Sequence, residues 1–164
     1  VDLTMGMWRL QELVQAIAQR RPGIAPDPGS PRRALFASVP GEQHGFGALV
    51  VEELFRRSGW DTTGARPDTL AALVAAVAER PLDLVGLSVS CDRFVPGLSG
   101  IVGAVRRTAR NPELIVMVGG PVFAAAPELA EDVGADLTAR DGALAVALCE
   151  ARLAAARHAS ALVA

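Results

Sequence analysis

Several features that would place the protein in a special class are missing from its sequence. Two cysteines, Cys91 and Cys149, are too few for a disulfide framework and lack the spacing of a metal cluster. No apolar run reaches the roughly 18 residues that a membrane-spanning helix needs. The first residues also lack the charged segment, apolar segment and cleavage site of a secretory leader. These absences favour a soluble protein in a reducing cytoplasm, without a membrane partner.

Positive charge is scattered along the chain. All 16 basic residues are arginines, and the net charge at pH 7 is −2. A surface that binds nucleic acid usually gathers basic residues on one face, so the sequence predicts no direct contact with nucleic acid. The length of 164 residues fits one domain with a sizeable core, and the oligomeric state stays open.

What the sequence does contain is an alternation of strand-like and helix-like segments. Apolar runs typical of buried strands lie at 34–39, 82–88 and 114–118, and two further short strands are expected just after 59–60 and near 135–138. Helical patterns with apolar residues on one face lie at 50–55, 67–81, 98–105, 124–132 and from 142 onward.

This alternation predicts an α/β protein with helices on both faces of a parallel sheet. We expect a doubly wound, five-stranded, flavodoxin-like (Rossmann-like) domain over residues 33–156. An N-terminal helix and a linker rich in Pro and Gly would precede it at 1–32, and a short tail would follow at 157–164. In such a fold ligands bind beyond the carboxyl ends of the first and third strands.

The loop after the first expected strand carries the most informative residues. It reads Pro40-Gly41-Glu42-Gln43-His44-Gly45-Phe46-Gly47, which is neither a dinucleotide fingerprint nor a phosphate loop. An imidazole with a carboxylate two residues earlier suits a metal ligand whose second ring nitrogen is held by an acceptor. A lone loop histidine is more often an ordinary polar residue, so the loop alone leaves both interpretations open.

Four segments together resemble the cobalamin-binding domain family. Glu42-x-His44-x-x-Gly47 resembles the Asp-x-His-x-x-Gly signature of that family, with glutamate in place of aspartate. The segment 83–90 resembles its third strand and Ser-x-Leu element, with Ser90 in place of the leucine. Residues 116–120, ending in paired glycines, and 134–141 resemble its fourth strand and its last strand with the start of the final helix. The resemblance covers residues 33–152.

The resemblance implies a cofactor and a set of binding residues. Cobalamin, in adenosyl, methyl or hydroxo form, would bind with its dimethylbenzimidazole displaced and with His44 as the lower axial cobalt ligand. Glu42 would accept the ring N–H of His44 through an arm one methylene longer than that of aspartate. Four small residues would wall a slot for the nucleotide tail, namely Gly47, Ser88, Gly119 and Gly120. The cofactor-binding residues implied are Glu42, Gln43, His44, Gly45, Phe46, Gly47, Ser88, Ser90, Gly119 and Gly120.

Within the family, the glutamate variant and the run from Ser88 to Arg93 most resemble the AerR/PpaA type, bacterial antirepressors of photosynthesis genes. This resemblance implies a light-responsive sensor that acts on a transcription factor and is not an enzyme. Two alternatives stay open: a haem or redox sensor of the same fold, and a corrinoid methyl carrier of a methyltransferase system.

Other candidate residues have less specific interpretations. Cys91 and Asp92 follow the third expected strand and face either the crevice or solvent. Trp8 is either a packing residue of the first helix or a cap on the corrin ring. His158 is expected at the surface, and Cys149 in the core.

Overall fold

A computed structural model describes the backbone of residues 23–25 and 31–163 and the side chains up to residue 156. The helix expected before residue 22, with Trp8, lies outside the described residues, and so does the side chain of His158. None of the described helices combines the length and the apolar character needed to cross a membrane.

Five parallel strands form a single sheet in the order β2-β1-β3-β4-β5. The strands are β1 (Arg33–Ser38), β2 (Asp61–Ala65), β3 (Leu84–Ser88), β4 (Ile115–Gly119) and β5 (Leu137–Thr138). This is the flavodoxin-like order predicted from the sequence. The three central strands are apolar nearly throughout because helices cover both of their faces.

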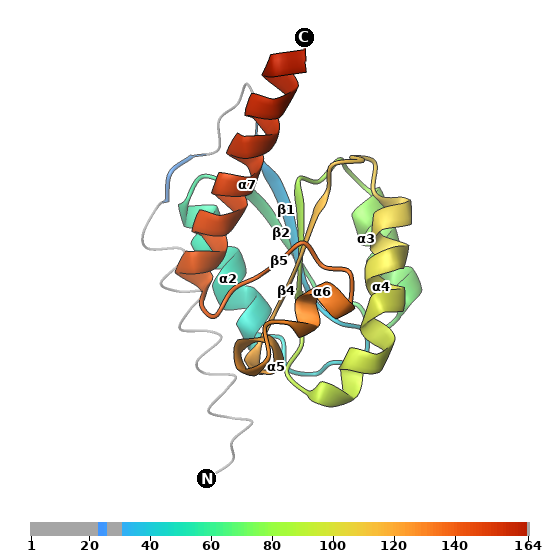
Figure 1. Cartoon of the computed structure of the whole chain (residues 1–164). Helices are drawn as coiled ribbons and strands as arrows, with labels where there is room; N and C mark the ends of the chain where they lie inside the picture. The colour runs from blue at the N-terminus through green and yellow to red at the C-terminus, as the bar shows by residue number, and fades with distance from the viewer. Residues whose placement is uncertain (1–22, 26–30, 164) are drawn as a thin grey trace.

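Four helices make the two outer layers. Figure 1 shows α2 (Phe46–Arg57) and α7 (Gly142–Val163) on one side of the sheet, and α3 (Leu70–Ala78) and α4 (Val95–Thr108) on the other. Alternate strand residues divide between two cores. Phe36 and Met117 pack on the side of α2 and α7, whereas Leu35 packs on the opposite side.

The structure differs from the sequence prediction at two helices. The sequence predicts one helix over 124–132, whereas the structure contains α5 (Pro121–Ala125) and α6 (Leu129–Asp132). Pro127 lies between them and lacks the N–H that a continuous helix would use. Residues 157–163, expected as a tail, continue the helix α7 as far as Val163. No Gly or Pro interrupts this alanine-rich segment after Gly142, and alanine favours helix.

Three connections gather at the carboxyl edge of the sheet. They are the loop 39–45 after β1, the short 3₁₀ helix η1 (Asp92–Phe94) after β3, and α5 after β4. Figure 1 shows α5 at this edge, while α7 runs toward the opposite end of the molecule. The fold therefore brings the loop 39–45, which carries Glu42 and His44, close to the residues that follow β3 and β4.

Candidate functional site

A tight turn shapes the loop after β1. The backbone N–H of Glu42 donates to the carbonyl of Val39 at 3.0 Å, which closes the turn. Gly41 has a φ of 83°, a conformation that residues with a side chain rarely adopt. The turn directs the next residues back over the end of β3.

The carboxylate of Glu42 joins two loops. Its Oε1 accepts hydrogen bonds from the backbone N–H of His44 at 3.0 Å and from the ring Nδ1 of His44 at 2.9 Å. Its Oε2 accepts from the backbone N–H of Ser90 at 3.2 Å and from the Ser90 hydroxyl. The Glu42 side chain is only 1% exposed. The longer glutamate arm therefore reaches the imidazole directly while also anchoring the loop after β3.

These hydrogen bonds set the protonation of the pair. Burial of the Glu42 carboxyl acts to raise its pKa, but the hydrogen bonds from Ser90 and His44 outweigh burial and lower the pKa to about 2. An ionised carboxylate can only accept hydrogen bonds, so Nδ1 of His44 must carry the ring proton. The neutral ring then keeps a lone pair on Nε2, and 72% of the side chain is exposed. This is the tautomer and the access that a metal ligand needs.

Glu42 should also make folding stability depend on pH. Because folding lowers its pKa from 4.5 to about 2, its contribution is complete above pH 4.5 and is lost as the pH falls toward 2. We expect Glu42→Gln to lower the free energy of unfolding at pH 7 by up to about 3 kcal/mol. The difference from wild type should shrink below pH 4.5. Urea unfolding between pH 7 and 3 measures it, with Glu79→Gln on the exposed surface as control. A pH-independent difference for Glu42→Gln would contradict the prediction.

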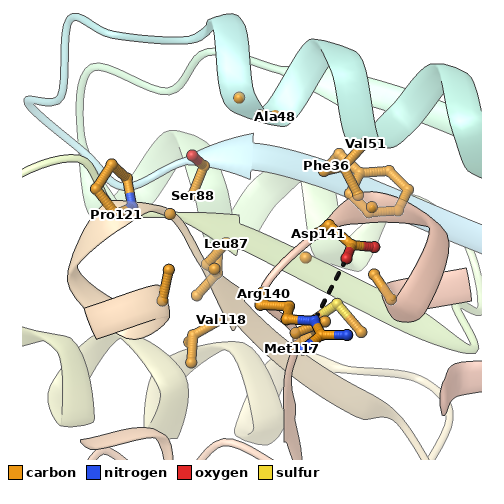
Figure 2. Close-up of a pocket in the computed structure, with 18 residues that line it drawn as sticks. Phe36, Ala48, Val51, Leu87, Ser88, Met117, Val118, Pro121, Arg140 and Asp141 are labelled. Carbon is orange, nitrogen blue, oxygen red and sulfur yellow. Dashed lines mark ion pairs between the residues drawn. The ribbon is translucent and has the colours of Figure 1, made fainter. Parts of the chain in front are cut away.

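A cavity of about 350 Å³ opens on the α2 and α7 side of the sheet. Phe36 and Met117 form part of its floor on the strands, and Ala48 and Val51 of α2 form a wall (Figure 2). The cavity adjoins the loop that carries Glu42 and His44, because Gly47 lies in the first turn of α2, just after that loop. All four residues predicted to wall a slot line this cavity, namely Gly47, Ser88, Gly119 and Gly120.

The cavity depends on the absence of side chains at its glycines. A Cβ atom on Gly119 would meet no heavy atom within 4 Å beyond its chain neighbours, so a side chain there would enter the open space. A Cβ on Gly47 would lie 3.1 Å from the hydroxyl oxygen of Ser88. Gly120 differs, because its φ of 115° and the nearby carbonyl of Val89 require glycine for the backbone itself. The cradle therefore fits a flat or narrow group inserted between sheet and helix.

Four of the other predicted residues lie away from the cavity. Gln43 is exposed, Gly45 is buried in the loop, and Phe46 is half-buried at the start of α2. Ser90 does not line the cavity either, because its hydroxyl is bonded to Glu42. Two departures from the family signature could have indicated this contact. Ser90 stands where the family has leucine, and Glu42 has a side chain one methylene longer than the family's aspartate.

Sequence reasoning missed the apolar floor and one rim of the cavity. Phe36, Val51 and Met117 had been assigned to the core alone. Arg140 and Asp141, between β5 and α7, form the rim, with 3.7 Å between Nε of Arg140 and Oδ2 of Asp141 (Figure 2). Cys149 lies in the core as expected, and its burial raises the pKa of the thiol to about 12.

Comparison with known proteins identifies the class of this domain. The sequence model of the B12 binding domain matches residues 32–149, so the chain belongs to the B12-binding domain family. The family makes the domain a cofactor-binding module and a corrinoid its class of cofactor.

Individual relatives are more distant. An "Uncharacterized 20.5 kDa protein in bchF-crtJ intergenic region" of Rhodobacter capsulatus is 26% identical over 152 residues, which cover 88% of this chain and 75% of the relative. A cobalamin-binding protein from Desulfitobacterium hafniense DCB-2 shares the fold with a TM-score of 0.65 and 24% identity, covering 74% of this chain and 58% of that one. The monomethylamine corrinoid protein of Methanosarcina barkeri has a TM-score of 0.61 and 17% identity, covering 89% and 65%. The chain thus spans less than two thirds of either solved structure.

Proposed function

We propose that this domain binds cobalamin with Nε2 of His44 as the lower axial ligand of cobalt. The observation that carries the proposal is the hydrogen-bonded chain Ser90–Glu42–His44, which holds the ring through Nδ1 and leaves Nε2 as the nitrogen free for a metal. One protein ligand suits a metal whose four equatorial positions a macrocycle already fills. The chain's own contribution is to hold that nitrogen in the right tautomer and direction.

The cavity supports cobalamin over haem. A lower ligand from the protein requires the cofactor's own base to be displaced, and a displaced nucleotide tail needs a narrow site close to the histidine. The cavity lined by Gly47, Ser88 and Gly119 offers such a site. Haem has no nucleotide tail and would leave the cavity without an occupant.

We further propose that the domain is a light-responsive sensor that acts on a transcription factor. Support comes from the resemblance to the AerR/PpaA type and from the relative encoded in a photosynthesis gene region of Rhodobacter. When bound, cobalamin would supply a cobalt–carbon bond that light can break. The protein's part would be to pass a change at His44 through Glu42 to Ser90 and on to η1. The scattered arginines favour action through a protein rather than on DNA directly.

Absorption spectra in the dark and after illumination test this proposal. We expect the purified protein, loaded with adenosylcobalamin or methylcobalamin, to show corrin bands that shift on illumination. Backbone hydrogen exchange over residues 88–94 should change with the spectrum, and Ser90→Ala should reduce that change because the link to Glu42 is lost. A Soret band in the protein as isolated would favour haem. Light-insensitive exchange, with methyl transfer to a thiol acceptor in the dark, would favour a methyl carrier.

A further inference from the structure

One buried hydroxyl near the site has no hydrogen-bond partner. Ser38 ends β1 and is only 3% exposed, and within the part of the chain that the structure describes its hydroxyl oxygen bonds to nothing. Buried polar groups are nearly always paired, and leaving one unpaired costs stability. The hydroxyl oxygen lies 3.5 Å from the position that a Cβ on Gly45 would take, under the start of α2. Ser38 is therefore enclosed by the loop that carries His44.

The neighbouring strand places a second hydroxyl beside it. Ser38 pairs with Ser88 in the parallel register of β1 and β3. Paired residues point to the same face of a sheet, on strands about 4.8 Å apart. That face is the one with the cavity, because Phe36, two residues before Ser38, lines the cavity and Ser88 lines it too. Figure 2 shows the Ser88 side chain pointing from β3 toward α2.

The two serines differ in their access to the cavity. Ser88 lies at the cavity wall, and its hydroxyl forms no hydrogen bond within the described residues. Ser38 lies behind it, away from the open space. The register places the Ser38 side chain on the same face of the sheet as Ser88 and on the neighbouring strand, next to the residue that lines the cavity.

The family resemblance implies that the Ser88 hydroxyl donates a hydrogen bond to the nucleotide tail. We propose that Ser38 is a positioning residue that donates to Ser88 and so orients its hydroxyl toward the free ring nitrogen of the cofactor's nucleotide base. This rests on the proposed binding of cobalamin. A benzimidazole displaced from cobalt has one unprotonated ring nitrogen, which is a hydrogen-bond acceptor. The chain Ser38 to Ser88 to base satisfies that acceptor and gives the buried Ser38 hydroxyl a partner. The Ser38 hydroxyl has no partner among the described residues, and we expect it to bond to Ser88 in the protein with the tail bound.

Binding of two corrinoids to serine variants tests the inference. Cobinamide keeps the corrin ring but lacks the nucleotide tail, so it reports the His44 contact alone. We expect Ser38→Ala and Ser88→Ala each to raise the Kd for cobalamin about three- to tenfold, the effect of one hydrogen bond, and to leave the Kd for cobinamide unchanged. The double variant should lose little more than Ser88→Ala, because Ser38 acts through Ser88. Absorbance titrations give all of these constants.

A matched control separates the binding role from packing. Thr138 has another buried hydroxyl without a partner among the described residues, but its neighbours Leu137 and Ala139 pack on the cavity side, so Thr138 points to the opposite face. Thr138→Val should leave both Kd values unchanged. Without cofactor, Ser38→Ala should be at least as stable as wild type in urea, because it removes an unpaired polar group.

The possible failures are distinguishable. Wild-type protein that binds neither corrinoid would overturn the proposed function. Normal cobalamin affinity in Ser38→Ala, with wild-type protein binding well, would overturn the role of Ser38 alone. An equal loss of cobalamin and cobinamide affinity would mean that Ser38 supports the loop rather than the tail contact.

Discussion

Replacing His44 by alanine should weaken cobalamin binding by more than about 100-fold. Loss of residues that merely support a metal ligand already costs 10- to 100-fold in affinity, and this change removes the nitrogen itself. The lower-ligand signature of the spectrum should disappear with it. Absorbance titration measures both effects. Free imidazole at millimolar concentration should restore the spectrum, because the space left by the side chain is open to solvent.

The chain's second histidine provides the control. His158 lies near the far end of α7, which runs away from the carboxyl edge of the sheet (Figure 1). His158→Ala should therefore bind cobalamin as wild type does, with the same spectrum. If His44→Ala keeps both its affinity and its spectrum, the assignment of the lower ligand fails.

Gly119→Leu should block the cavity and weaken cobalamin binding strongly while leaving the protein folded. A Cβ at this position would meet no heavy atom within 4 Å and would point into the cavity, and the φ of Gly119 is outside the left-handed region, so the backbone tolerates the change. The tail would then have no room, and we expect a loss of more than about 30-fold, as for several lost contacts of about 1 kcal/mol each. Cobinamide should still bind through His44.

Gly100→Leu is the matched variant for this test. Gly100 is an exposed glycine of α4 with equally open space around it, on the other side of the sheet. It should bind cobalamin and cobinamide normally, and circular dichroism should find both variants folded. A folded Gly119→Leu protein with wild-type affinity for cobalamin would mean that the tail lies elsewhere.

The sequence predicted the local parts of the site well. Glu42 and His44 are two residues apart in one turn, so their contact needs no information about the rest of the fold. The strand order followed from the alternation of strands and helices, since crossover handedness leaves few arrangements. The four slot residues were implied by the family resemblance, and the structure places them at or next to the ends of β3 and β4 and in the first turn of α2, where they line the cavity.

Contacts between distant segments could not be predicted in the same way. The bond from Ser90 to Glu42 joins residues 48 positions apart, and it depends on how far each loop extends beyond its strand. In the sequence Ser38 is one more small residue in an apolar strand. Only the register of the sheet shows that it pairs with Ser88, a residue of the cavity wall. The division of the helix at Pro127 was open to prediction, because proline at that position is a sufficient signal.

The anchored imidazole has a consequence for the thermodynamics of binding. Glu42 is held by four donors before any cofactor arrives, so the direction and tautomer of His44 are established during folding. Less rotational freedom then remains to be lost when cobalt is bound. A variant that frees the ring, such as Glu42→Ala, should lose affinity mainly through a less favourable entropy of binding. Its complex with cobalamin should also dissociate faster than that of the wild type.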